Sequence, residues 1–84
     1  MQATAWKGAT FGVRVGSRNA HRYFDKQWEF VDVDLDGKHH RIRLSDSFWA
    51  RCPELRSVAF GDWFLLHGLR PWPKGKPSRL QLIP

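Results

Sequence analysis

The stretch from residue 70 to residue 79 carries the residue types best suited to binding chemistry in this sequence. Its candidate binding residues are Arg70, Trp72, Lys74, Lys76 and Arg79, with no acidic residue among them. Cations neutralise phosphates, and an exposed ring offers a base a stacking surface worth about 1–3 kcal/mol, which favours single strands. We therefore predict a nucleic-acid-binding loop here. The alternative is a solvated loop in which the tryptophan folds back over the core.

A second basic and aromatic stretch runs from residue 17 to residue 27. Its candidate binding residues are Arg18, His21, Arg22, Tyr23 and Lys26. The stretch has no clean helical or strand period, so we expect an exposed connection that can contain a helical turn. Tyr23 and Phe24 are adjacent and cannot easily both face outward, so at least one of them is expected in the core.

Histidine and cysteine spacing does not predict a catalytic or metal site. His39 and His40 are neighbours on a predicted strand and point to opposite faces, so they cannot chelate one ion together. The single cysteine, Cys52, cannot form an intrachain disulfide or a thiolate cage. We predict no metal, no cofactor, no small-molecule substrate and no enzymatic activity; a small nuclease using His21 or His39 is the enzymatic alternative.

The charge of the chain favours an acidic partner. The 84 residues include 14 Lys and Arg against 8 Asp and Glu, giving a net charge of +6. Such a surplus on a small domain indicates nucleic acid first, then an acidic protein or an anionic membrane surface. No stretch approaches the roughly 20 apolar residues of a membrane span, so we expect no membrane association and a cytoplasmic location.

Aromatic content supports a different class of function. Five tryptophans are many for a chain of this length, and exposed apolar patches often mark partner surfaces. A protein-interaction module, as a homodimer or as a subunit of a larger assembly, is therefore the alternative to nucleic-acid binding.

Residues 28 to 44 predict a hairpin, because apolar and polar residues alternate on both sides of a tight-turn signal at Asp36-Gly37-Lys38. Two turn registers keep the apolar residues on one face. The register centred on Gly37 and Lys38 places Asp32 opposite Arg43, and cross-strand charge pairing favours it. The three aspartates of this hairpin would repel phosphate. The residues that bind nucleic acid would therefore have to lie in the two loops, together with Arg14 or Lys7.

The remaining patterns predict one domain over residues 1–84. Residues 1–8 are expected to be loosely ordered or an edge strand; further strands are expected at 9–16, 63–69 and 79–83, and a short helix at 45–55, broken at Pro53. Five strands with a helix between the third and fourth is the element order of an OB-fold-like β-barrel, in which residues 17–27 and 70–79 flank one binding face. An SH3-like barrel and a small α+β fold are the alternatives.

Overall fold

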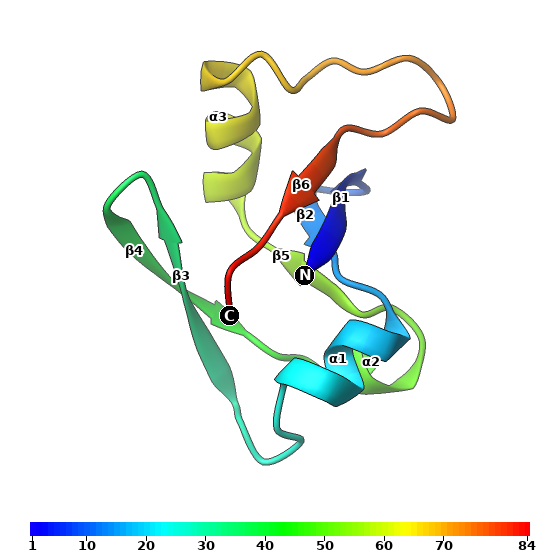
Figure 1. Ribbon diagram of the computed structural model, residues 1–84, viewed down its shortest axis with the longest axis vertical. Helices are drawn as coiled ribbons and strands as arrows, with labels where there is room; N and C mark the ends of the chain where they lie inside the picture. Colours follow the sequence, from blue (N-terminus) through cyan, green and yellow to red (C-terminus); the bar gives the residue numbers. More distant parts are fainter.

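The computed structural model describes residues 1–84 and shows an α+β fold with six strands and three helices. The elements are β1 (Gln2–Lys7), β2 (Phe11–Arg14), α1 (Ser17–Tyr23), β3 (Phe30–Leu35), β4 (Lys38–Arg43), α2 (Asp46–Ala50), β5 (Glu54–Arg56), α3 (Val58–Leu66) and β6 (Arg79–Gln81). Four strands form an antiparallel sheet in the order β5-β2-β1-β6, and β3 pairs with β4 as a separate antiparallel hairpin (Figure 1).

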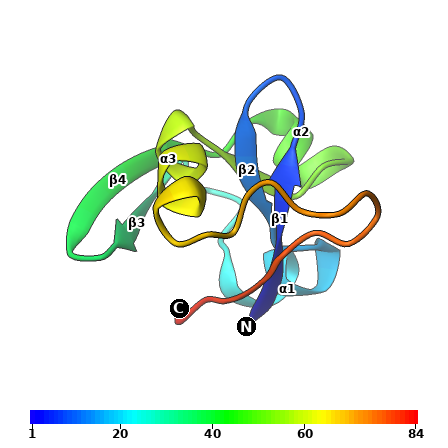
Figure 2. The ribbon, with the colours of Figure 1, turned by 90° about the horizontal axis from the view of Figure 1, so that it is seen from above.

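The core lies on one side of the four-stranded sheet. Both ribbon views place α3 and the β3–β4 hairpin on that side, while α1 and α2 lie together at one end of the sheet (Figures 1 and 2). The buried apolar residues are Ala3, Ala5, Val13, Val15, Ala20, Ile42, Leu44, Phe48, Leu55, Phe60 and Phe64. None of the three helices has the length and apolar character needed to cross a bilayer.

The OB-like barrel predicted from the sequence is wrong. The strands form two separate sheets with no closed barrel, so the SH3-like alternative is wrong as well, and the α+β alternative describes the protein. The predicted element order failed at residues 54–56, which form a strand, and at residues 63–69, which do not. Residues 17–23, expected in a connection that can contain a helical turn, form a helix of seven residues. Residues 70–78 contain no helix or strand, as their prolines predict.

The predicted strand at residues 63–69 is replaced by the end of α3. Phe60 and Phe64 are four residues apart, and both are buried against the sheet. That spacing places them on one face of a helix. The run looked like a doubly buried strand because Leu65 and Leu66 are also apolar, but these two side chains are exposed. A short apolar run has no period that separates a helix from a buried strand.

Residues 1–8 form an interior strand rather than an edge strand or a loose segment. β1 pairs with β2 on one side and with β6 on the other. Ala3 and Ala5 are buried, whereas Gln2, Thr4 and Trp6 alternate with them on the opposite face. Alanine gives only a weak strand signal, so the alternation in the sequence does not by itself predict an interior strand.

The hairpin is confirmed, but its preferred register is wrong. Asp36 and Gly37 occupy the two turn positions with φ angles of 55° and 86°, and Asp32 lies opposite Arg41 rather than Arg43. Two central residues with positive φ match the natural twist of paired strands. The exposed pair between Arg41 Nε and Asp32 Oδ1, 3.6 Å apart, is worth under about 1 kcal/mol, so turn geometry decides the register.

Asp36 also connects the hairpin to the C-terminal end of α3 through side-chain hydrogen bonds. Its carboxylate accepts a hydrogen bond from Trp63 Nε1 at 3.0 Å, and its Oδ2 lies 2.5 Å from His67 Nε2. The hydrogen bond with His67 is the main cause that lowers the pKa of Asp36 below its ordinary value of 3.8, and the bond from Trp63 adds to it. The ionised carboxylate is therefore favoured in the folded state.

Asp36→Asn is expected to lower the melting temperature at pH 6 and to have a smaller effect at pH 2. Because the pKa is lowered in the folded state, the carboxylate contributes its stabilisation above 3.8 and loses it as the pH falls through the lowered value. Asparagine also tolerates positive φ, so the turn itself is kept. Thermal melts of both proteins at the two pH values measure the effect, and an equal deficit at both would contradict it.

Candidate nucleic-acid interface

The two predicted binding segments lie at opposite ends of the four-stranded sheet. The segment with Arg18, His21, Arg22 and Tyr23 is α1 and is followed by Lys26, whereas the loop after α3 carries Lys74 and Lys76. Figure 1 shows α1 at the lower end of the sheet and the loop at the upper end. They do not form facing walls of one groove; instead each borders one end of the sheet, with Arg79 on β6 between them.

The loop after α3 shows a mixed arrangement. Trp72 is half-buried and packs edge to face against Phe11 and Phe64, with ring centroids 6.3 and 6.2 Å apart. The Arg70 guanidinium lies 4.5 Å from the centre of the Phe11 ring. Trp72 therefore covers the core, as the alternative interpretation of this loop predicted. Lys74 and Lys76 are exposed and form no ion pair.

The α1 segment presents cations but little free aromatic surface. Its exposed candidates are Arg18, His21, Arg22 and Lys26. Phe24 packs in the core against Phe48, with ring centroids 5.2 Å apart, as one of the adjacent aromatic pair was expected to do. Tyr23 is half-buried, with the Arg22 guanidinium 5.4 Å from its ring centre.

The outer face of the four-stranded sheet brings Arg79 and Arg14, both named from the sequence, together with Trp6 and Arg56, which the sequence did not predict. The strand register sets Arg79, Thr4 and Arg14 side by side across β6, β1 and β2, with Glu54 of β5 next in line. Because Ala3 and Ala5 point into the core, Thr4 and its neighbours in this row point away from it. We call this surface the outer face.

Trp6, Gly12 and Arg56 form the adjoining row of the outer face. The Arg56 guanidinium lies 4.8 Å from the centre of the Trp6 ring. Gly12 makes the contact possible, because a Cβ at this position would collide with the Leu55 carbonyl oxygen and press on the Trp6 ring. The alternation of Gln2, Thr4 and Trp6 with alanines is the sequence signal for the β1 part of this surface.

Glu54 fixes two of the three arginines on the outer face. It is buried, and its carboxylate binds Arg14 Nε at 3.1 Å and Arg56 Nη2 at 3.0 Å. One acid between two guanidiniums leaves a net positive charge and holds both side chains in place. Arg79 is exposed and has no ion pair, and it lines a pocket of about 330 Å³ together with Arg14 and Gly16.

No protein-family model, curated protein or solved structure matches this chain. Its functional interpretation therefore depends on the geometry of its own surface. The outer face combines a half-buried indole, two guanidiniums held by Glu54 and an arginine without an ion pair.

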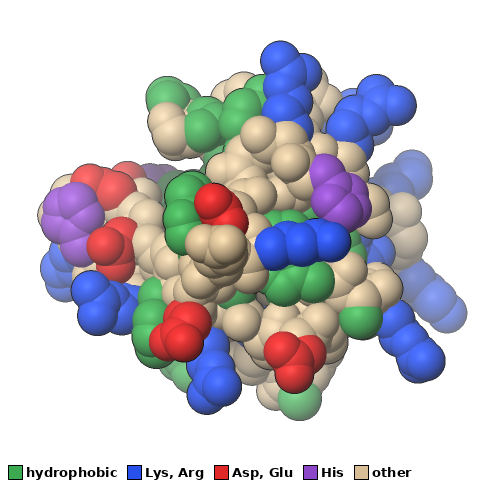
Figure 3. All heavy atoms as spheres, turned by 90° about the horizontal axis from the view of Figure 1, so that it is seen from below, with side chains coloured by type: hydrophobic (Ala, Val, Ile, Leu, Met, Phe, Trp, Pro, Cys, Tyr) green, Lys and Arg blue, Asp and Glu red, His purple; other side chains and the backbone are tan.

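The cationic surface continues beyond the outer face. Of the 14 lysines and arginines, only Arg14, Arg41 and Arg56 take part in ion pairs. Figure 3 shows Lys and Arg side chains along the right-hand side of the molecule with no acidic side chain among them. On the left, where Figures 1 and 2 place the β3–β4 hairpin, acidic, histidine and basic side chains are mixed. The three aspartates of the hairpin balance its Lys38, Arg41 and Arg43, so the net positive charge of the protein lies outside the hairpin.

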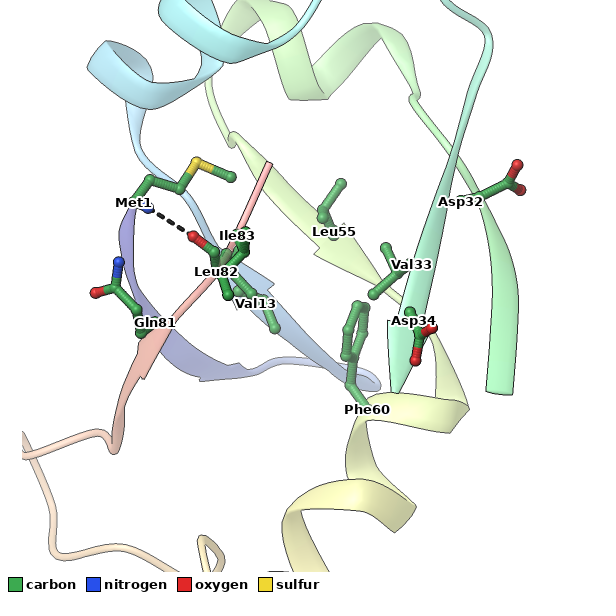
Figure 4. A pocket seen from close by; sticks show the side chains of 10 residues that line it. All are labelled: Met1, Val13, Asp32, Val33, Asp34, Leu55, Phe60, Gln81, Leu82 and Ile83. Atoms are coloured by element: carbon green, nitrogen blue, oxygen red, sulfur yellow. Dashed lines mark hydrogen bonds between the residues drawn. The ribbon is translucent and has the colours of Figure 1, made fainter. Parts of the chain in front are cut away.

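A mostly apolar cavity has a different chemistry. It measures about 470 Å³, lies between β3 and β6, and includes Val13, Leu55 and Phe60 among its lining residues. Figure 4 shows Val33 on one side of this cavity and Leu82 on the other. No lysine or arginine lines it, so it does not suit phosphate. β3 and β6 each pair with one strand only, which leaves their other edges without a strand partner.

Histidine and cysteine side chains do not gather into a site. No group of three or more His, Cys, Asp or Glu side chains lies close enough to hold a metal ion. His67 is bonded to Asp36, His39 lies 3.7 Å from Asp34, and Cys52 is half-buried. The expected absence of enzymatic activity and of a cofactor stays a prediction.

Proposed function

We propose that this protein binds single-stranded DNA or RNA on the outer face of its four-stranded sheet. The observation that carries the proposal is the pairing of Trp6 with Arg56 next to an unpaired Arg79 on one open sheet face. This site replaces the two-walled groove expected from the sequence. We also propose that the protein acts in the cytoplasm, as expected for a chain with a single, unpaired cysteine.

The outer face suits a single strand better than a duplex. Base stacking on Trp6 requires an unpaired base, because the faces of paired bases are occupied by their neighbours in the stack. Arg79 and the exposed part of Arg14 supply phosphate contacts along the same row. Since Glu54 already holds Arg14 and Arg56, less side-chain freedom is lost when the strand binds.

Both ends of the outer face extend the phosphate contacts. Arg18 and Arg22 on α1 lie at one end, and Lys74 and Lys76 lie in the loop at the other. These side chains are exposed cations without ion pairs, so they increase affinity for any strand and add little sequence preference. The proposal therefore predicts binding that depends strongly on salt and weakly on sequence.

Arg79→Ala is expected to weaken binding of a labelled single-stranded oligonucleotide by about 3-fold to 10-fold at 50 mM salt. Losing one phosphate contact should also reduce the slope of log K against log salt by about 0.7. Fluorescence anisotropy between about 50 and 200 mM salt measures both quantities. Arg43→Ala is the matched control, because Arg43 is an exposed strand cation of the hairpin and does not belong to the outer face. Equal losses in the two variants would refute the outer-face assignment.

A protein-interaction module is the second candidate, and the cavity between β3 and β6 favours it. A groove with an apolar floor between two strand edges that lack partners can accept an extended peptide as an added strand. Ile83, which is 92% exposed, also lines this groove. This candidate predicts no salt-sensitive oligonucleotide binding, so the same titration separates the two functions.

A further inference from the structure

A second cationic cavity lies near the upper end of the sheet. It measures about 360 Å³ and is lined by Lys7, Phe11, Leu65, Arg70, Pro71 and Trp72. We call it the Lys7–Arg70 cavity. Its size is within the range of small-ligand sites, and it combines flat apolar walls with charged groups of one sign.

Lys7 and Arg70 converge on the same aromatic ring. Lys7 Nζ lies 5.8 Å and the Arg70 guanidinium 4.5 Å from the centre of the Phe11 ring, so the two charges are at most about 10 Å apart. No acidic residue lines the cavity, and neither cation forms an ion pair. Two like charges beside a low-dielectric wall repel each other, and a bound anion would relieve that repulsion.

The arrangement suits a phosphorylated nucleotide end. A terminal phosphomonoester carries close to two negative charges at pH 7, whereas an internal phosphodiester carries one, so two cations match the terminal group better. Pro71 and Trp72 supply flat apolar surface for the attached base. Lys7 directly follows Trp6 on β1, with Trp6 on the outer face and Lys7 on the core side of the same strand end.

We propose that the Lys7–Arg70 cavity binds the phosphorylated end of the single strand that lies on the outer face. The terminal phosphate contacts Lys7 and Arg70, and the last base lies against Trp72. A strand that passes Trp6 and crosses the end of β1 reaches this cavity. This inference rests on the proposed function, and it adds recognition of a strand end to binding along the strand.

The test compares three short oligonucleotides of one sequence, with a 5′-phosphate, with a 3′-phosphate, or with neither, each labelled away from the phosphate. Fluorescence anisotropy at 50 mM salt and pH 7.5 gives the three affinities. One of the phosphorylated forms is expected to bind the wild type about 10-fold more tightly than the unphosphorylated form. That ratio should fall to near one in Lys7→Gln and in Arg70→Gln, because each variant loses one charge of the pair.

Lys74→Gln is the matched control, since Lys74 is an exposed cation of the same loop and does not line the cavity. It should weaken all three oligonucleotides equally and keep the ratio. Lys7 is exposed, so Lys7→Gln decides the question even if Arg70→Gln loosens the packing on Phe11. Equal, salt-sensitive affinities for all three in the wild type would overturn the strand-end site and leave the outer-face proposal standing. Binding of none would overturn both.

Discussion

Phe64→Ala is expected to lower the free energy of unfolding by about 3–5 kcal/mol, the range found for removing a large aromatic side chain from a core. Phe64 is 0% exposed, and its ring packs against Phe11, Phe60 and Trp72 at centroid distances of 6.2, 6.4 and 6.2 Å. It therefore joins α3, β2 and the loop after α3. A domain of 84 residues has little stability to spare, so this one change should leave much of the protein unfolded at 37 °C.

Leu66→Ala is the control for Phe64→Ala. Leu66 lies on the same helix and is 78% exposed, so its loss should change stability by under about 0.5 kcal/mol. Urea denaturation followed by tryptophan fluorescence and by circular dichroism measures both variants. A similar loss in the two would mean that α3 does not pack on the sheet through Phe64, and the helical assignment of this segment would then be wrong.

Trp6→Ala is expected to weaken single-strand binding by about 10-fold to 100-fold, because one stacked base contributes about 1–3 kcal/mol. The effect should exceed that of Arg79→Ala, since stacking is screened less by salt than a phosphate contact is. The loss should therefore persist at 200 mM salt. Anisotropy titrations at 50 and 200 mM measure it.

Two variants separate stacking from folding at Trp6. Trp6→Phe keeps a ring and should recover part of the affinity, whereas Trp28→Ala should bind like the wild type. Trp28 is 47% exposed and packs on Phe24, with ring centroids 6.4 Å apart, and it does not belong to the outer face. Melting temperatures of the variants report any loss of folded protein. Unchanged affinity in a folded Trp6→Ala protein would show that Trp6 does not stack a base.

Local signals in the sequence predicted the hairpin, the irregular loop and the final strand. The same signals did not predict the register of the hairpin, because pairing of exposed charges favours a different register from the one that turn geometry requires. Asp36 and Gly37 both adopt positive φ, and that requirement outweighs pairs such as Asp32 with Arg41. Asp36 also has partners on α3, which no hairpin pattern contains.

The candidate site was less predictable than the fold because it is assembled from distant segments. Trp6 and Arg56 are 50 positions apart, and they meet only because β1, Gly12 of β2 and β5 are neighbours in the sheet. The two contiguous basic segments were visible in the sequence, but Trp72 turned toward the core. The contiguous basic segments indicated where charge lies, but they could not show which aromatic ring lies on the outer face of the sheet.

The pairing of β1 with β6 has a consequence for the order of folding. The two strands come from the two ends of the chain, and the Met1 ammonium donates to the Leu82 carbonyl oxygen at 2.6 Å. Contacts of such sequence separation form slowly, because most of the chain must be ordered first. During synthesis, β1 can pair with β2 early, but its other edge stays open until residues 79–81 leave the ribosome. A nascent chain stalled before that point exposes a strand edge to other chains.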